Sequence, residues 1–222
     1  MTLERHDRLP LVLVALLALI CLATAWAPPA GRQSWALEVV PGLLMVLALA
    51  ILHRKMPMCA LTQVAIFVHV LILVYGGYYT YALTPLGNWA RDTWHLSRNH
   101  YDRVGHLALG LFPALLAREV LLRRTPLQRG GWLAFLTFCV VFAFGAFWEL
   151  LEWWVTLIVA GDVGTAFLGT QGDEWDAQWD MALVGLGAIL TLSFAQRLHD
   201  RSMQCLDAMR AESPQAAHPN LE

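Results

Sequence analysis

Six apolar stretches, each about as long as one bilayer crossing, constrain this sequence more than any other feature. They cover residues 9–26, 35–52, 59–81, 104–122, 132–160 and 180–195. A helix needs roughly 20 mostly apolar residues to cross about 30 Å of hydrocarbon. Charged residues make up only 14% of the chain, against about a quarter of a typical soluble domain. The sequence therefore predicts an all-α fold, a polytopic membrane helix bundle with about six transmembrane helices.

The stretches follow one another without an internal repeat, a low-complexity tract or a separate soluble domain. We expect a single transmembrane helical domain over residues 1–212 and a disordered cytoplasmic tail over residues 213–222. The cysteines lie in or near different stretches without Cys-x-x-Cys spacing, at Cys21, Cys59, Cys139 and Cys205. This pattern favours small apolar packing residues over a disulfide framework or a zinc knuckle.

Basic residues in short loops indicate which way the chain crosses the membrane. Six crossings place both termini on one side, where eleven basic residues lie: Arg5, Arg8, Arg54, Lys55, Arg118, Arg123, Arg124, Arg129, Arg197, Arg201 and Arg210. The other side holds four: Arg32, Arg91, Arg98 and Arg103. Both termini are therefore expected to be cytoplasmic.

One alternative concerns the first stretch, which resembles a cleavable signal peptide. Arg5 and Arg8 precede an apolar run that ends in two candidate cleavage motifs, Ala23-Thr24-Ala25 and Ala25-Trp26-Ala27. Pro28 follows one candidate cleavage site directly and disfavours cutting there. Cleavage would leave the orientation of the other five stretches unchanged.

The acidic residues gather on the side opposite the termini. Ten lie on or near that face: Glu38, Asp92, Asp102, Glu149, Glu152, Asp162, Asp173, Glu174, Asp176 and Asp180. Against four arginines they leave an excess of six negative charges. Such a surface favours cations or requires protons.

Spacing brings several of these acids to one depth. Asp102 and His106 are four residues apart and share a face if the fourth helix begins early enough. Glu149 lies near the outer boundary of the fifth stretch, and Glu152 follows one turn later. The sixth stretch has a similar approach, because a helix that begins near Asp173 would align the three aspartates Asp173, Asp176 and Asp180.

Buried carboxylates must be protonated, paired with cations or bound to metal. Mixed carboxylate and imidazole ligands suit manganese, iron or zinc, and magnesium is favoured if histidine does not bind. The sequence predicts a divalent metal held by Asp102, His106, Glu149, Asp173, Asp176 and Asp180. Glu152 is the expected general base, acting on water that such a metal activates.

A structural interpretation of the same residues stays open. Acids at helix starts stabilise the helix dipole, and Arg98 and Arg103 are placed to neutralise two of them. A transport function would need a polar route through the membrane, for which only Thr62, Gln63 and His69 are candidates on the third stretch. His69 stands among apolar residues, which favours a core histidine over a proton relay.

Several enzyme classes are disfavoured because their motifs are missing. The chain contains no Gly-x-Ser-x-Gly, His-Glu-x-x-His or phosphate-binding glycine loop. Membrane lipids are the expected partners. No nucleic acid is expected, and the oligomeric state stays open.

Three motifs carry a resemblance to a known family. They are HYDRVGH at 100–106, WELLE at 148–152 and GDEWDAQWDM at 172–181. Together they resemble the YjdF-type family of uncharacterised bacterial inner-membrane proteins over most of the chain. The last three stretches are also loosely similar to VanZ-like proteins, in which glutamine often stands in place of Glu152. The resemblance implies a bacterial inner-membrane location and no established reaction.

The leading functional hypothesis is a metal-assisted enzyme that acts on a lipid or envelope-precursor headgroup. It rests on the depth of the acidic cluster, which lies where lipid headgroups meet the outer face. The alternatives are a cation- or proton-coupled transporter and a non-enzymatic accessory membrane protein.

Overall fold

The computed structural model describes residues 8–159 and 170–212, which form helices joined by turns and contain no strand. Within these ranges, six helical segments are long and apolar enough to cross a membrane: α1 (Arg8–Trp26), α2 (Arg32–Leu52), α3 (Ala60–Tyr79), α5 (Tyr101–Arg124), α6 (Gly131–Ile158) and the run Asp176–Ala211. The predicted all-α membrane bundle of about six helices is confirmed. Asp162 and the tail at 213–222 lie outside the described residues.

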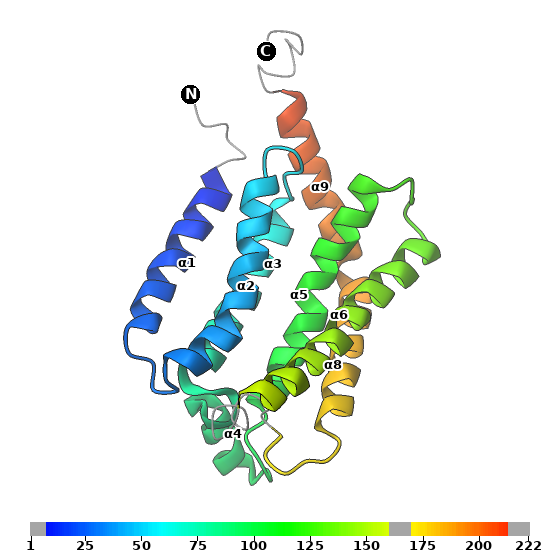
Figure 1. Cartoon of the computed structure of the whole chain (residues 1–222). Coiled ribbons are helices and arrows are strands. Elements are labelled where there is room, and N and C mark those ends of the chain that lie inside the picture. Colours follow the sequence, from blue (N-terminus) through cyan, green and yellow to red (C-terminus); the bar gives the residue numbers. More distant parts are fainter. Residues whose placement is uncertain (1–7, 160–169, 213–222) are drawn as a thin grey trace.

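The ends of the bundle differ in what they hold (Figure 1). The start of α1 and the end of the last helix lie at one end, called the α9 end below. The short helix α4 (Pro85–Trp94) and the start of the last transmembrane helix lie at the other, called the α4 end. Helix α4 was not predicted, because it is a polar helix with Pro85 at its first position rather than an apolar run.

The last transmembrane helix extends beyond the predicted stop near residue 195. It consists of α8 (Asp176–Leu190), a π-helical turn η3 (Thr191–Ala195) and α9 (Gln196–Ala211). Its 36 residues span roughly 54 Å, more than the hydrocarbon core needs. In α9 the buried side chains are His199, Met203 and Leu206, spaced three and four apart. These three side chains lie on one face, through which the polar helix α9 packs on the bundle. A search for apolar runs does not detect such a helix.

A close crossing of α5 and α8 fixes the positions of the residues before it. A Cβ atom added to Gly110 would lie 2.1 Å from the carbonyl oxygen of Val184. One added to Gly187 would lie 2.4 Å from the carbonyl oxygen of Leu107. The two backbones are therefore in contact, an approach that glycine permits in membrane helices. Asp102 of α5 and Asp180 of α8 lie about two turns before this crossing, on its α4-end side.

Alanine at either crossing glycine should destabilise the bundle. We expect Gly110→Ala and Gly187→Ala each to cost about 1–3 kcal/mol, because the added methyl group meets backbone atoms. Gly185→Ala is the matched control on α8, since its added Cβ would be 3.4 Å from the Phe142 ring. Thermal unfolding in detergent measures the effect. Equal unfolding temperatures for the three variants would contradict this account of the crossing.

Candidate functional site

His106 of α5 is surrounded by three carboxylates from three helices. Its Nε2 atom lies 2.9 Å from Glu149 Oε1 on α6. Its Nδ1 atom lies 3.4 Å from Asp180 Oδ1 on α8 and 3.5 Å from Asp102 Oδ1 on α5. Because α5 begins at Tyr101, Asp102 and His106 share one helix face, as their spacing predicted. The structure thus brings four of the predicted metal ligands together.

These four side chains are buried and incompletely paired. They are between 2% and 10% exposed. Despite the short distances, His106 Nε2, Glu149 Oε1 and Asp180 Oδ1 have no hydrogen-bond partner among the described residues. His106 Nδ1 lies 3.3 Å from the carbonyl oxygen of Asp102. If Nδ1 donates its proton to that carbonyl, a neutral ring presents the Nε2 lone pair to Glu149, an acceptor facing an acceptor.

This arrangement calls for positive charge. A protonated His106 would neutralise one of the three carboxylates, and the others would still need protons or a cation. Ligand atoms of Asp102, His106 and Asp180 all lie within 4.8 Å of one another. A single divalent cation is the arrangement that imidazole and carboxylate ligands at such spacing suit. A metal-binding histidine is usually oriented by a hydrogen bond from its second ring nitrogen. If Nδ1 makes that bond, the lone pair is on Nε2 beside Glu149, and if Nδ1 binds the cation, its neighbours are Asp102 and Asp180.

The other two predicted ligands, Asp173 and Asp176, already have cationic partners. Arg98 Nη1 lies 2.5 Å from Asp176 Oδ1, and Arg103 Nη2 lies 2.5 Å from Asp173 Oδ2. The hydrogen bond from the Trp175 amide, together with Arg103, holds the pKa of Asp173 below its ordinary value. Metal binding by either aspartate stays a prediction, which these ion pairs disfavour.

The predicted alignment of three aspartates on one helix is wrong in one position. Helix α8 begins at Asp176, and Asp173 lies in the preceding turn. Asp173 Oδ1 accepts a hydrogen bond from the backbone N–H of Trp175 at 3.0 Å. Aspartate commonly forms this local bond at turns, where it competes with helix formation. Asp176 and Asp180 remain one turn apart on the same helix.

Glu152, the predicted general base, lies beside the cluster. Its Oε1 atom accepts a hydrogen bond from Trp148 Nε1 at 2.7 Å. Both side chains line a cavity of about 400 Å³, as do Asp102 and His106. Trp148 therefore orients Glu152.

The cavity combines a polar end with a long apolar wall. Its lining on α5 extends from Asp102 to Leu121, nineteen residues or roughly 28 Å along the helix. Beyond the polar end the α5 side is apolar, with residues such as Leu116 and Val120. Among the described residues, neither lysine nor arginine lines it. The cavity therefore has the shape and polarity of a site for one chain of an amphiphile.

Two polar residues line this cavity that the sequence did not assign to the metal site, Glu38 and His69. Glu38 of α2 is 5% exposed and makes no hydrogen bond or ion pair with any described residue. His69 of α3 is 2% exposed, and its Nδ1 atom has no hydrogen-bond partner there. Glu38 was counted among the outer acids but lies in none of the three motifs. The sequence does single out Glu38 in one respect, because it is the sole acidic residue of the apolar stretch 35–52 and acids inside membrane spans are often functional.

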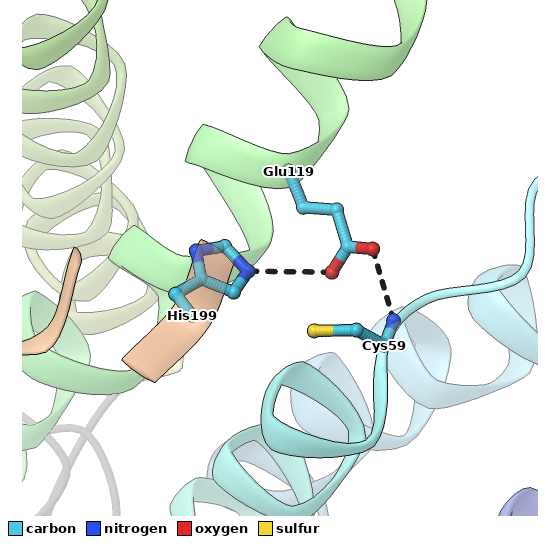
Figure 2. Close-up of side chains that lie close together, drawn as sticks. All are labelled: Cys59, Glu119 and His199. Atoms are coloured by element: carbon cyan, nitrogen blue, oxygen red, sulfur yellow. Dashed lines mark hydrogen bonds and ion pairs between the residues drawn. The ribbon is translucent and has the colours of Figure 1, made fainter. Parts of the chain in front are cut away.

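A second buried cluster lies at the α9 end and was also missed from the sequence. Cys59, Glu119 and His199 are fully buried, and their potential ligand atoms lie within 4.8 Å of one another (Figure 2). The Glu119 carboxylate is saturated with donors. Oε1 accepts from the Cys59 backbone N–H at 2.9 Å and from Arg123 Nε at 2.8 Å. Oε2 accepts from Thr62 Oγ1 at 2.6 Å.

The tautomer of His199 decides whether this second cluster can bind a metal ion. Its Nδ1 atom lies 3.1 Å from Arg118 Nη1, and a guanidinium group only donates. Nδ1 is therefore an acceptor, and the ring proton is on Nε2, which faces Thr62 Oγ1 at 3.1 Å. Both ring nitrogens are engaged, so no lone pair is left for a cation. The cluster is best described as a hydrogen-bonded tie that holds α9 against α3 and α5.

Removing the carboxylate of this tie should loosen the bundle. We expect Glu119→Gln to cost about 3–5 kcal/mol, because the amide replaces one acceptor oxygen by an NH2 donor that faces buried donors and removes the counter-charge of Arg123. Asp207→Asn is the control, since Asp207 is the exposed partner of the same arginine. Thermal unfolding in detergent checks the difference.

Cys59→Ala separates the tie from a metal site. Cys59 reaches Glu119 through its backbone N–H, which alanine keeps, so this variant loses the 3.4 Å contact of its sulfur with Thr62 Oγ1 but should unfold at a higher temperature than Glu119→Gln. A loss of bound metal on replacing the thiol would show instead that the cluster is a metal site.

Comparisons with known proteins agree with this architecture. The family model described as "Predicted membrane protein (DUF2238)" matches residues 9–201. A protein of Escherichia coli strain K12, "Inner membrane protein YjdF", is 43% identical over 173 residues, which are 78% of this chain and 82% of that protein. No solved structure matches. The comparisons do not show the looser similarity to VanZ-like proteins. With the match running from its first transmembrane helix into α9, the chain belongs to the DUF2238 family of multi-pass membrane proteins.

Proposed function

We propose that this protein is a metal-assisted enzyme that acts on the headgroup of a membrane lipid or a lipid-linked envelope precursor. One observation carries the proposal. The buried cluster around His106 opens onto a cavity of about 400 Å³ whose remaining wall is largely apolar. A polar site at the end of an apolar slot can hold a reacting headgroup while the slot holds a chain.

The four clustered side chains would form the metal site. Asp102, His106, Glu149 and Asp180 offer one imidazole and three carboxylates, a set that suits zinc, manganese or iron, with magnesium less favoured. Such a cation would polarise a phosphoryl or carbonyl group and lower the pKa of a bound water. The protein would supply the orientation, because the close α5–α8 crossing and the Asp102 carbonyl fix the ring of His106.

Glu152 is the proposed general base. It lines the cavity next to the cluster but has its own orienting partner in Trp148. It comes from α6, one turn beyond Glu149, so one helix would supply both a metal ligand and the base. A carboxylate held by one indole N–H keeps acceptor capacity for a proton from water.

The proposed membrane orientation places this site in the outer leaflet of the bacterial inner membrane. Basic residues are concentrated at the α9 end, which the positive-inside rule assigns to the cytoplasm. At the α4 end Arg91, Arg98 and Arg103 are paired with aspartates. Both termini would then be cytoplasmic, and the His106 cluster would face the periplasmic headgroups.

The transport alternative is supported less well by the geometry. Of its candidates, Thr62 hydrogen-bonds Glu119 in the tie and does not line the large cavity. Deeper than His69 the α5 side of the cavity is formed by residues such as Leu116, Val120 and Leu121. An accessory protein with a purely structural core would be expected to pair its buried carboxylates, which the His106 cluster does not.

Metal content tests the proposed site directly. We expect near-stoichiometric divalent metal in the purified, detergent-solubilised wild type and little in a Glu149→Gln, Asp180→Asn double variant, measured by elemental analysis. Asp92→Asn, which removes an exposed acid of α4 outside the cluster, should keep the metal. The same low metal content in all three proteins would remove the proposed metal site.

Activity separates the base from the ligands. Glu152→Gln should keep the metal but lower turnover of the active lipid substrate by roughly 10²–10⁴-fold, the range typical of a lost general base. The assay follows headgroup release or transfer from a panel of envelope lipids in detergent. Wild-type turnover in Glu152→Gln would assign the base to another residue.

A further inference from the structure

A close contact between α2 and α3 fixes the backbone position of Glu38, which lines the cavity. A Cβ atom added to Gly77 of α3 would lie 2.9 Å from the Cβ atom of Glu38 and 3.0 Å from a methyl group of Val39. The missing side chain at Gly77 thus lets α2 approach closely at this residue. The carboxyl group of Glu38 contributes to the lining that Glu152, Asp102 and His106 also form.

No lysine or arginine among the described residues pairs with Glu38, whose charged neighbours are Asp102 and His106. Glu38 makes no ion pair with any described residue, and among these residues neither lysine nor arginine lines the cavity. At the α4 end the arginines have other partners, since Arg91, Arg98 and Arg103 pair with aspartates and Arg32 donates to the Trp26 carbonyl oxygen. A buried carboxylate in a membrane span must then carry a proton or meet a cation that comes from outside.

That external cation is distinct from the proposed metal. The metal cluster is assembled from α5, α6 and α8, whereas Glu38 comes from α2. Asp102, Glu149 and Asp180 each have an oxygen within 3.5 Å of a His106 ring nitrogen, whereas Glu38 makes no such contact with the ring. Glu38 therefore faces the space where a substrate would lie.

The shape of the cavity indicates what kind of molecule brings this charge. Its α5 wall is roughly 28 Å long, which accommodates an acyl chain of one leaflet, or about half of the 30 Å hydrocarbon core. Its acids gather at the α4 end, where headgroups lie in the proposed orientation. A cationic group and an apolar chain on one molecule match the two parts of the lining.

We propose that the cavity binds a lipid with a primary ammonium headgroup and that Glu38 receives the ammonium group. This inference rests on the proposed function for the identity of the cavity as the substrate site, and it names the substrate class. Glu38 is then a specificity-determining residue, since an ammonium group supplies both a hydrogen-bond donor and the charge that neutralises the carboxylate. A lipid with an anionic or purely hydroxylated headgroup would leave the charge of the carboxylate uncompensated.

The experiment compares two lipids that differ in headgroup alone. Delipidated protein in detergent is titrated with phosphatidylethanolamine or phosphatidylglycerol carrying identical chains, and bound lipid is counted by native mass spectrometry. We expect the wild type to prefer phosphatidylethanolamine by roughly ten- to a hundredfold, the range of a hydrogen bond to a charged group. Glu38→Gln should lose that preference. Glu38→Asp, which keeps the charge, should retain part of it.

Two controls make the result specific. Asp92→Asn should behave like the wild type, because Asp92 is an exposed acid of α4 outside the cavity. Water-soluble glycerophosphoethanolamine should compete weakly, because it lacks the chain. Equal competition by this headgroup alone would indicate a free-amine site rather than a lipid site and would overturn the proposal.

The stability of the variant is measured separately. Glu38→Gln should unfold at a temperature no lower than that of the wild type, since it removes an unpaired buried carboxylate.

Metal content in the same samples separates this inference from the proposed enzyme. A Glu38-dependent preference in a protein without metal would uphold the lipid class and remove the metal mechanism. Bound metal together with equal affinity for both lipids, or an unchanged preference in Glu38→Gln, would overturn the inference about Glu38 and leave the metal site standing.

Discussion

The cost of keeping carboxylates in a membrane interior governs the α4 end of this protein. Three carboxylates surround His106 within 3.5 Å, in side chains that are at most 10% exposed. At low dielectric that arrangement is stable only with protons or with a bound cation. Nearby, Arg98 and Arg103 neutralise Asp176 and Asp173. The contrast between the acids paired with arginine and the unpaired ones distinguishes a structural layer from a cluster that needs protons or a cation.

The α9 end satisfies the same physical requirement by different means. Glu119 is as buried as any acid of the other cluster, yet each of its oxygens accepts from protein donors. Arg118 fixes the tautomer of His199, so the histidine completes the network instead of offering a lone pair. Similar residue types thus form a mechanical tie at one end and an open cluster at the other. What differs is whether the protein supplies the donors.

The sequence predicted what local spacing controls and missed what tertiary packing controls. Apolar runs located the transmembrane helices, and the four-residue spacing of Asp102 and His106 placed both on one face of α5. The packing of α9 on the bundle was not predicted, because the buried face of this helix is narrow and its composition is polar. Glu38 escaped because its role depends on the contact of α2 with Gly77 of another helix. Asp173 was placed inside a helix because the competing turn is a side-chain effect that periodicity ignores.

The π-helical turn η3 has a geometric consequence for these two ends. Nineteen residues separate Asp180 from His199, and in a regular α-helix that spacing would rotate the second side chain by about 100° from the first. A π turn takes up one extra residue. The remaining spacing of about eighteen residues corresponds to five complete α-helical turns at 3.6 residues per turn. The added residue therefore restores the angular register, so a single helix presents its α4-end carboxylate and its α9-end imidazole to the same neighbour, α5.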